Sequence, residues 1–281
     1  MASEIQCGYL LPEPTKKADG THGAFLGTIV LKDNTTHPVF IKCNNIHKVT
    51  IELFASKLIE SIGLKTPTPY LVFCPEELIP SESVNVLLRE NVSWIEVNDK
   101  KLFLGFACEE VSLPSVNQKV GSELTMSIAK TFVDLFTKNC PGYTDVIGFD
   151  EWIANGDRNL GNILWDGQKE FYLIDHGLAM NEAYFNAFGN KLLSLIVLAS
   201  NPSSQKSNFI FKKSLSFIET LQNQIIDSAA SNLLNLNHPD ISKNVLLLSE
   251  MLKRRIKESQ ISLALKKSSM FTKELFVQPS N

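Results

Sequence analysis

The sequence has no surplus of basic residues. Its 281 residues include 27 lysines and arginines against 30 aspartates and glutamates, which gives a formal net charge of −3. Proteins that bind nucleic acid or anionic membranes need an excess of positive charge to neutralise phosphates. We therefore expect neither direct nucleic-acid binding nor a membrane partner.

Closely spaced cysteines and long apolar runs are also missing. The five cysteines lie more than 30 residues apart from one neighbour to the next, which excludes a Cys-x-x-Cys zinc site. Leu192–Ser200, the longest strongly apolar stretch, is about half as long as a membrane span. The N-terminus shows no basic segment followed by an apolar run. We expect a soluble, cytoplasmic protein with free thiols.

The composition is that of an ordinary globular protein, with 44% hydrophobic and 9% aromatic residues. A chain of this length forms one large domain or two small ones. On folding it buries roughly 75% of the surface that the unfolded chain exposes. A sizeable core is therefore available.

The first hundred residues predict strands and one helix. Ala24–Leu31 and Pro38–Lys42 are runs of β-branched and aromatic residues with a turn signal between them. From residue 50 to residue 62 the apolar side chains recur every three or four positions, which indicates a one-sided helix. Thr50 is the expected N-cap of this helix, and Gly63 its expected stop.

Beyond Glu109-Glu110 the pattern becomes mainly helical. Helices are predicted over 120–137 and 143–154. A β-hairpin interrupts them, with strands at 162–165 and 171–174 and a two-residue turn at Asp166-Gly167. The last hundred residues are rich in leucine, isoleucine, serine and lysine, and their period is helical.

The residues most suggestive of chemistry lie around this hairpin. Asp157 is followed five residues later by Asn162, and Asp175 and Gly177 come directly after the hairpin. Phosphoryl transfer needs one carboxylate that orients and deprotonates the acceptor hydroxyl, and an amide oxygen and second carboxylate that hold Mg²⁺ against the phosphates. The alternative is a capped helix end with two turn residues.

These residues resemble those of a known family. The stretch 156–162, Gly-Asp-Arg-Asn-Leu-Gly-Asn, resembles the Gly-Asp-Arg-His-x-x-Asn loop of HipA-like and phosphoinositide 3/4-kinase-like proteins. The stretch 174–177 resembles their Asp-Phe-Gly segment, and 52–67 is similar to a helix and Gly-Leu-Pro stretch of HipA-like proteins. The resemblance implies an α+β, two-lobed, protein-kinase-like fold, with a β-rich N-lobe at 1–108 and a helical C-lobe at 109–281.

The resemblance also implies roles for residues in the second part. Asp157, Asn162 and Asp175 would be catalytic, and Asn162 and Asp175 would hold the metal. Two positions depart from the family pattern, since Asn159 replaces the common histidine and His176 replaces the phenylalanine. Arg158 is expected to have a structural or phosphate-side role.

In the first part, the resemblance implies ATP-binding residues. Lys42 fits the strand lysine that contacts the phosphates, and Glu52 the helix residue that pairs with it. The alternatives are an exposed edge-strand lysine and a solvated glutamate in the first turn of a helix.

Glycines and a hinge would complete the nucleotide site, with ATP in the cleft. Gly20 and Gly23 would belong to a loop over the phosphates, although both could simply form turns. The backbone of the segment with Phe106 and Cys108 would contact adenine.

The expected function is that of an ATP- and Mg²⁺-dependent kinase acting on a hydroxyl of a protein substrate, with serine or threonine as acceptor. The resemblance further suggests a toxin-type bacterial context and an antitoxin-like regulator. One alternative is a lipid or small-molecule kinase. Another is a nucleotide-binding pseudokinase that docks partners, which the departures at Asn159 and His176 would favour.

Overall fold

The computed structural model describes residues 4–12, 16–17, 24–80, 92–120, 126–140, 142–200 and 205–274. The chain divides into two compact units. The first unit comprises Met1–Ser112 and Asp227–Leu247, and the second comprises Leu113–Ile226 and Leu248–Asn281. The predicted fold class is confirmed, since the N-terminal part is rich in strands and the C-terminal part is helical.

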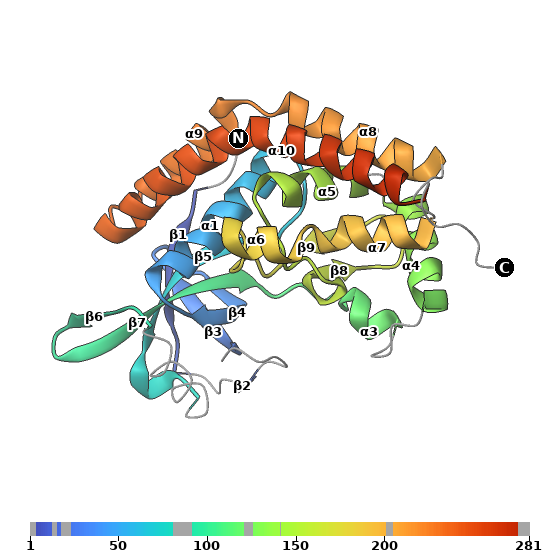
Figure 1. Ribbon diagram of the computed structural model, residues 1–281. Coiled ribbons are helices and arrows are strands. Elements are labelled where there is room, and N and C mark those ends of the chain that lie inside the picture. Colours follow the sequence, from blue (N-terminus) through green and yellow to red (C-terminus); the bar gives the residue numbers. More distant parts are fainter. Residues whose placement is uncertain are drawn as a thin grey trace. The chain divides into compact units, whose positions relative to one another are not determined.

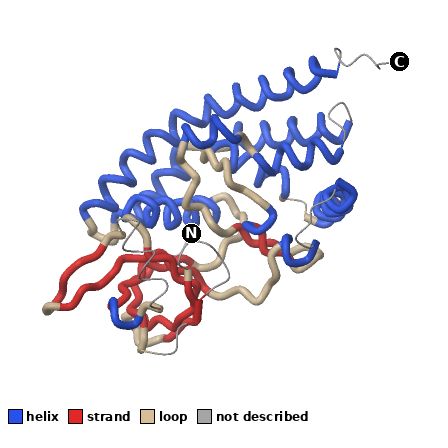
Figure 2. Tube along the Cα trace, turned by 60° about the horizontal axis from the view of Figure 1, so that its bottom comes forward, coloured by secondary structure: helices blue, strands red, loops and turns tan. Residues whose placement is uncertain are grey.

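The first unit is built on a sheet. Its elements are β1 (Gln6–Leu10), β2 (Lys16–Lys17), β3 (Phe25–Leu31), β4 (Thr36–Cys43), α1 (Ile46–Ser61), β5 (Pro69–Pro75), the 3₁₀ turn η1 (Glu76–Leu78), β6 (Trp94–Val97) and β7 (Lys100–Glu109). The strand order is β1-β5-β7-β4-β3-β2, and β6 pairs with β7 to form a projecting hairpin (Figure 1). Because β1 also pairs with β3, the strands from β1 through β5, β7 and β4 to β3 close into a ring. Figure 2 shows them gathered in one curved group.

The interior of the ring is the core of the first unit. Alternate residues of each strand point inward, as the two-residue period of a strand requires. The buried side chains include Phe25, Ile29, Val39, Ile41, Val72, Phe103 and Ala107. Gly8 makes the closure between β1 and β3 possible, because a Cβ atom there would lie 2.8 Å from Cδ1 of Ile29.

The helix predicted in the first unit is present but begins earlier than expected. Asn45, not Thr50, is the N-cap of α1, and its side chain accepts a hydrogen bond from the backbone N–H of Lys48. Thr50 lies inside the helix, where its hydroxyl donates to the carbonyl of Ile46. The predicted stop at Gly63 is confirmed, since its φ of +77° allows the left-handed conformation that ends the helix.

The second unit is mainly helical. Its elements are α3 (Val116–Val120), α4 (Met126–Asn139), α5 (Tyr143–Trp152), the 3₁₀ turn η2 (Leu160–Asn162), β8 (Ile163–Trp165), β9 (Phe171–Leu173), α6 (Glu182–Phe188), α7 (Lys191–Ser200) and α8 (Gln205–Thr220). Two further helices, α9 (Asn223–Leu234) and α10 (Pro239–Glu274), have residues in both units. No described helix is long and apolar enough to cross a membrane.

The hairpin β8–β9 exists, but its predicted two-residue turn is wrong. Trp165 pairs with Phe171, which leaves a five-residue loop between the strands. The reason is the side chain of Asp166, whose Oδ1 accepts hydrogen bonds from the backbone N–H groups of Gln168 and Glu170. This carboxylate stabilises the longer loop, as aspartate does in local turns.

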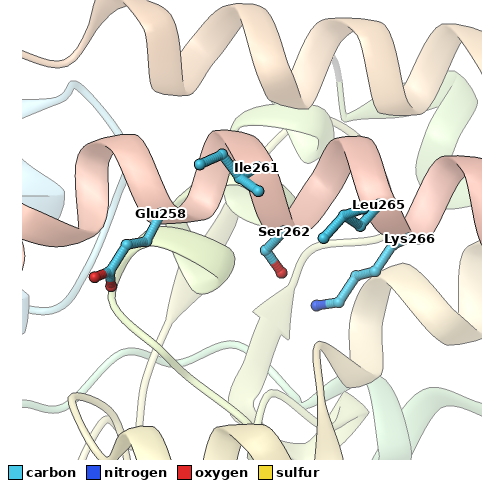
Figure 3. A pocket seen from close by; sticks show the side chains of 5 residues that line it. All are labelled: Glu258, Ile261, Ser262, Leu265 and Lys266. Carbon is cyan, nitrogen blue, oxygen red and sulfur yellow. The ribbon is translucent and has the colours of Figure 1, made fainter.

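An ion pair with a buried carboxylate joins the C-terminal half of α10 to α5. Glu151 is completely buried, and it accepts hydrogen bonds from Lys266 at 2.7 and 2.9 Å and from Ser262 at 2.7 Å. Figure 3 shows Ser262 and Lys266 extending from the same side of α10. A shallow, open hollow at the surface there is lined by described residues of α10, which are Glu258, Ile261, Ser262, Leu265 and Lys266.

We expect Lys266→Met to lower the free energy of unfolding by about 2–4 kcal/mol, because it leaves the buried Glu151 carboxylate without its cation. The matched control is Lys253→Met, also on α10. The Lys253 side chain is 30% exposed against 29% for Lys266, but its partner Glu250 is exposed at the surface. This control should change stability by less than about 0.5 kcal/mol. Chemical denaturation measures both, and equal losses would contradict the prediction.

Candidate active site

The chain turns tightly at the start of the loop between α5 and η2. Ala154 has a φ of +53°, and two residues later Gly156 packs against α6. A Cβ atom on Gly156 would lie 2.9 Å from Cδ1 of Tyr184 and 3.3 Å from Cα of Phe185. A glycine is therefore required at this position, immediately before Asp157.

Arg158 joins the predicted site segments inside the second unit. Its side chain is fully buried, and its Nε lies 3.1 Å from Oδ2 of Asp150 on α5. Nη1 donates to the backbone carbonyls of Asn162, at 3.1 Å, and of Ile174, at 2.9 Å. Nη2 donates to Nδ1 of His176 at 3.1 Å. One guanidinium thus connects α5, the loop with Asn162 and the segment with Asp175.

The partner of this arginine is a buried carboxylate. Burial raises the pKa of Asp150, although the charge of Arg158 and the hydrogen bonds from Arg158 and Asn155 act in the opposite direction. Asn155 Nδ2 donates to Asp150 Oδ1 at 3.0 Å, and its own Oδ1 accepts from the backbone N–H of Asp157 at 3.0 Å. Asp150 therefore fixes both sides of the loop that carries Asp157.

Asn162 is oriented by the same loop. Its side-chain Nδ2 donates to the backbone carbonyl of Asp157 at 2.9 Å. Its own backbone carbonyl accepts the N–H of Ile174 at 3.2 Å, which connects the loop directly to the residue before Asp175. With the amide nitrogen engaged, the side-chain oxygen is the atom of Asn162 that can serve as a ligand.

Asp175 has a strained backbone conformation. Its φ is +58°, in the left-handed region that non-glycine residues enter rarely. Ile174 separates Asp175 from the end of β9. Ile174 is held in place by two hydrogen bonds, because its carbonyl accepts from Arg158 and its N–H donates to the carbonyl of Asn162. Such strain persists only where the surroundings impose it, and it concentrates at functional sites.

Both departures from the family pattern have structural roles. Asn159 caps η2, since its Oδ1 accepts the N–H of Gly161 at 2.7 Å, and its Nδ2 donates to the carbonyl of Asp157 at 3.2 Å. His176 is buried against Arg158. Because a guanidinium only donates, Nδ1 of His176 is the acceptor and its proton lies on Nε2.

Lys191, the first residue of α7, was missed by the sequence analysis. Its Nζ donates to Oδ1 of Asp157 at 2.7 Å, and the Tyr184 hydroxyl lies 3.4 Å from the same oxygen. Partial burial lowers the pKa of Lys191, but the hydrogen bond and charge of Asp157 outweigh it, so the pKa stands above its ordinary value. Because the two partners are 34 positions apart in the sequence, no short motif contains both of them.

The donor set around Asn162 fits magnesium. Mg²⁺ is usually held by one or two protein oxygens together with substrate phosphates and water. Asn162 and Asp175 supply one amide oxygen and one carboxylate on joined segments. Among the described residues no three His, Cys, Asp or Glu side chains converge on a metal site. An ion that takes its remaining ligands from phosphates does not need such a cluster.

In the first unit, Lys42 and Glu52 form the expected ion pair. Nζ of Lys42 on β4 lies 3.2 Å from Oε1 of Glu52 on α1, and their side chains are 26% and 5% exposed. The alternatives considered from the sequence, an exposed edge-strand lysine and a solvated glutamate in the first turn of a helix, do not fit. Lys42 lies on a strand flanked by β3 and β7, not at an edge, and Glu52 is buried in the second turn of α1.

The remaining predicted ATP-binding residues lie either outside the described residues or within the sheet. Gly20 and Gly23 lie outside the described residues. Phe106 and Cys108 lie within β7, between β4 and β5, where the backbone takes part in the sheet. Their contact with adenine stays a prediction, because the chain leaves the sheet only after Glu109.

We expect Arg158→Met to lower the free energy of unfolding by about 3–5 kcal/mol, because it leaves the Asp150 carboxylate buried without its cation. The double variant Arg158→Met/Asp150→Asn should recover part of this loss. Arg254→Met is the control, since the Arg254 side chain is 54% exposed and its loss should change stability far less. Chemical denaturation measures all three, and a small loss in Arg158→Met would contradict the account.

No curated protein sequence matches the chain significantly. Among solved structures, the proinflammatory kinase CtkA of Helicobacter pylori matches with a TM-score of 0.49 at 15% identity, over 85% of this chain and 94% of that chain. The FAT and kinase domain of CtTel1 matches with a TM-score of 0.30 at 12% identity, over 85% of this chain and 20% of that chain.

The sequence profile of a family described as HipA-like kinase matches residues 15–215. This range includes Lys42, Glu52 and the whole segment from Asp150 to Lys191. The family predicted from the sequence is thereby confirmed. Because the matched residues make up more than two thirds of the chain, the protein belongs to the HipA-like kinase family.

Proposed function

We propose that this kinase uses ATP and Mg²⁺ and transfers the γ-phosphate to a serine or threonine hydroxyl of a protein. The observation that carries the proposal is the connection made by Arg158. It joins the loop with Asp157 and Asn162 to the residue before Asp175. Three side chains of the types that phosphoryl transfer needs are thus held on one rigid framework.

Each of these side chains has a distinct role in the proposal. Asn162 Oδ1 and the Asp175 carboxylate hold Mg²⁺, which neutralises charge on the phosphates when it is bound. Asp157 accepts the proton of the acceptor hydroxyl. Its Oδ1 accepts hydrogen bonds from Lys191 and Tyr184, whereas no described residue donates to its Oδ2. Oδ2 is therefore the oxygen that faces the acceptor.

In the first unit, the proposal gives Lys42 the role of a phosphate contact. An ammonium group on a strand, held by a buried carboxylate, cannot swing freely into solvent. Glu52 keeps Nζ of Lys42 in place and contributes no direct contact with the nucleotide. The pairing corresponds to the lysine and glutamate of the kinase pattern.

The proposed protein kinase is favoured over a lipid kinase and over a docking module. The net charge of −3 does not favour attraction to an anionic lipid surface. The docking-module alternative relied on Asn159 and His176, and both residues have structural roles that leave the three chemical side chains in place. The antitoxin-like regulator stays a prediction.

Incubation of the purified protein with γ-labelled ATP and Mg²⁺, followed by mass mapping of phosphorylated sites, tests the proposal. We expect phosphoserine or phosphothreonine on the chain itself or on an added protein. Asp157→Asn should reduce transfer by about 100-fold or more, because the proton acceptor is lost. Its affinity for ATP should not change.

Two results would contradict the proposed function. Absence of any transfer by the wild-type protein that nonetheless binds Mg-ATP would favour a docking module. Label on a lipid or small molecule, and none on protein, would favour the other enzyme class.

Variants of Lys42 and Glu52 separate the effect of this ion pair on ATP turnover from its effect on stability. Lys42→Met should abolish most ATP turnover, because a charge-assisted phosphate contact is lost. It should also destabilise the fold by about 1–3 kcal/mol, since the buried Glu52 loses this cation. Glu52→Gln alone should give a milder loss of turnover.

The double variant Lys42→Met/Glu52→Gln is the decisive member of this set. We expect it to regain stability, because the buried charge is gone, and to turn over ATP no faster than Lys42→Met. Turnover and chemical denaturation are measured on all variants. A Lys42→Met protein with full turnover would remove Lys42 from the nucleotide site.

A further inference from the structure

The carboxylate of Asp157 has a cationic partner that comes from another element. Lys191 begins α7, and its Nζ lies 2.7 Å from Asp157 Oδ1. The two side chains are 36% and 25% exposed, so the pair lies at the surface of the second unit and can meet a ligand. At 2.7 Å this is a short, charge-assisted hydrogen bond.

The ammonium group of Lys191 lies near two aromatic rings of α6. Tyr184 and Phe188 are tilted against each other with their ring centroids 4.5 Å apart. Nζ of Lys191 lies 5.8 Å from the centroid of each ring, within the range of a cation–π contact. The lysine is therefore held between the aromatic pair and the carboxylate.

Neighbours of Asp157 in the catalytic loop do not supply this cation. Arg158 is adjacent in sequence, but its guanidinium is buried and bonded to Asp150. Asn159 is neutral, and both polar atoms of its side chain are bonded within the turn. A positive charge beside the proton acceptor therefore comes from α7, 34 residues further along the chain.

We propose that Lys191 is the positioning residue of Asp157, which holds Oδ1 so that Oδ2 faces the acceptor hydroxyl. This inference rests on the proposed function. In the transfer step, the acceptor oxygen forms a bond to the γ-phosphorus as the bond from that phosphorus to the ADP oxygen breaks. The hydroxyl proton moves to Oδ2 of Asp157. Lys191 neither gives nor takes a proton in this step.

Kinetics on Lys191 variants tests this role. Lys191→Met should lower kcat between about 10- and 100-fold, because the carboxylate keeps only the longer hydrogen bond from Tyr184 among those described and is misplaced for most of the time. KM for ATP should change less than about threefold, since ground-state nucleotide binding does not involve Lys191. Lys191→Arg keeps the positive charge and a donor, and it should recover a large part of kcat.

A double variant and a matched control complete the kinetic test. In the Asp157→Asn background, Lys191→Met should lower kcat no further, because both changes disable one unit. Lys206→Met is the control. Lys206 lies 2.9 Å from Asp134 in a surface ion pair of the same unit, so its loss should leave kcat unchanged.

Lysine acylation without nucleotide gives a readout that does not depend on activity. Only the neutral amine reacts, and the raised pKa of Lys191 keeps it protonated. Limiting acetic anhydride with mass-spectrometric mapping should therefore label Lys191 several-fold faster in Asp157→Asn than in the wild type. Labelling of Lys206 should be the same in both proteins.

The outcomes separate the two proposals. Full kcat in Lys191→Met, or equal acylation of Lys191 in wild type and Asp157→Asn, would overturn the positioning role. A wild-type protein without transfer activity would overturn the proposed function and, with it, the role of Lys191 in the step. The acylation result would then still decide whether the two side chains form the pair.

Discussion

The buried ion pair between Arg158 and Asp150 is the interaction on which the site depends. A guanidinium presents its donors in a fixed, planar arrangement, and here they are shared among one carboxylate, two backbone carbonyls and one imidazole nitrogen. Burying two charges is costly unless the hydrogen bonds are complete. In this molecule the hydrogen bonds of Arg158 to Asp150 and to two backbone carbonyls offset that cost. The bond to the carbonyl of Ile174 also joins two segments that are 16 residues apart in sequence.

The C-terminal helix contributes to the same framework. Arg255 on α10 donates to the carbonyls of Glu151 and Trp152, at 2.6 and 2.8 Å, just where α5 ends and the loop with Asp157 begins. Trp152 in turn donates its indole N–H to the carbonyl of Leu252. The carbonyls of Glu151 and Trp152 thereby receive the hydrogen bonds that the last carbonyls of a helix lack within the helix itself. Arg255, which lies beyond the matched residues 15–215, thus holds the end of α5, where the loop with Asp157 begins.

The sequence predicted those features that are set by local patterns. The helix near residue 52, the strands around Lys42 and the hairpin before Asp175 follow from periodicity and turn residues. The errors also have local causes. The side chain of Asn45 caps α1 earlier than predicted, and the side chain of Asp166 stabilises a longer loop between β8 and β9 than predicted. Contacts between distant residues could not be predicted. The closure of the ring by β1 and β3, and the pairing of Lys191 with Asp157, depend on tertiary packing that no spacing encodes.

The central claim is that Asn162 and Asp175 form one metal site for the nucleotide phosphates. A crystal structure with Mn²⁺ and a non-hydrolysable ATP analogue tests it most directly, because manganese is located by its anomalous scattering. We expect an anomalous peak about 2.1 Å from Oδ1 of Asn162 and from a carboxylate oxygen of Asp175, with analogue phosphates as further ligands. A bound analogue whose metal lies on other residues would contradict the account.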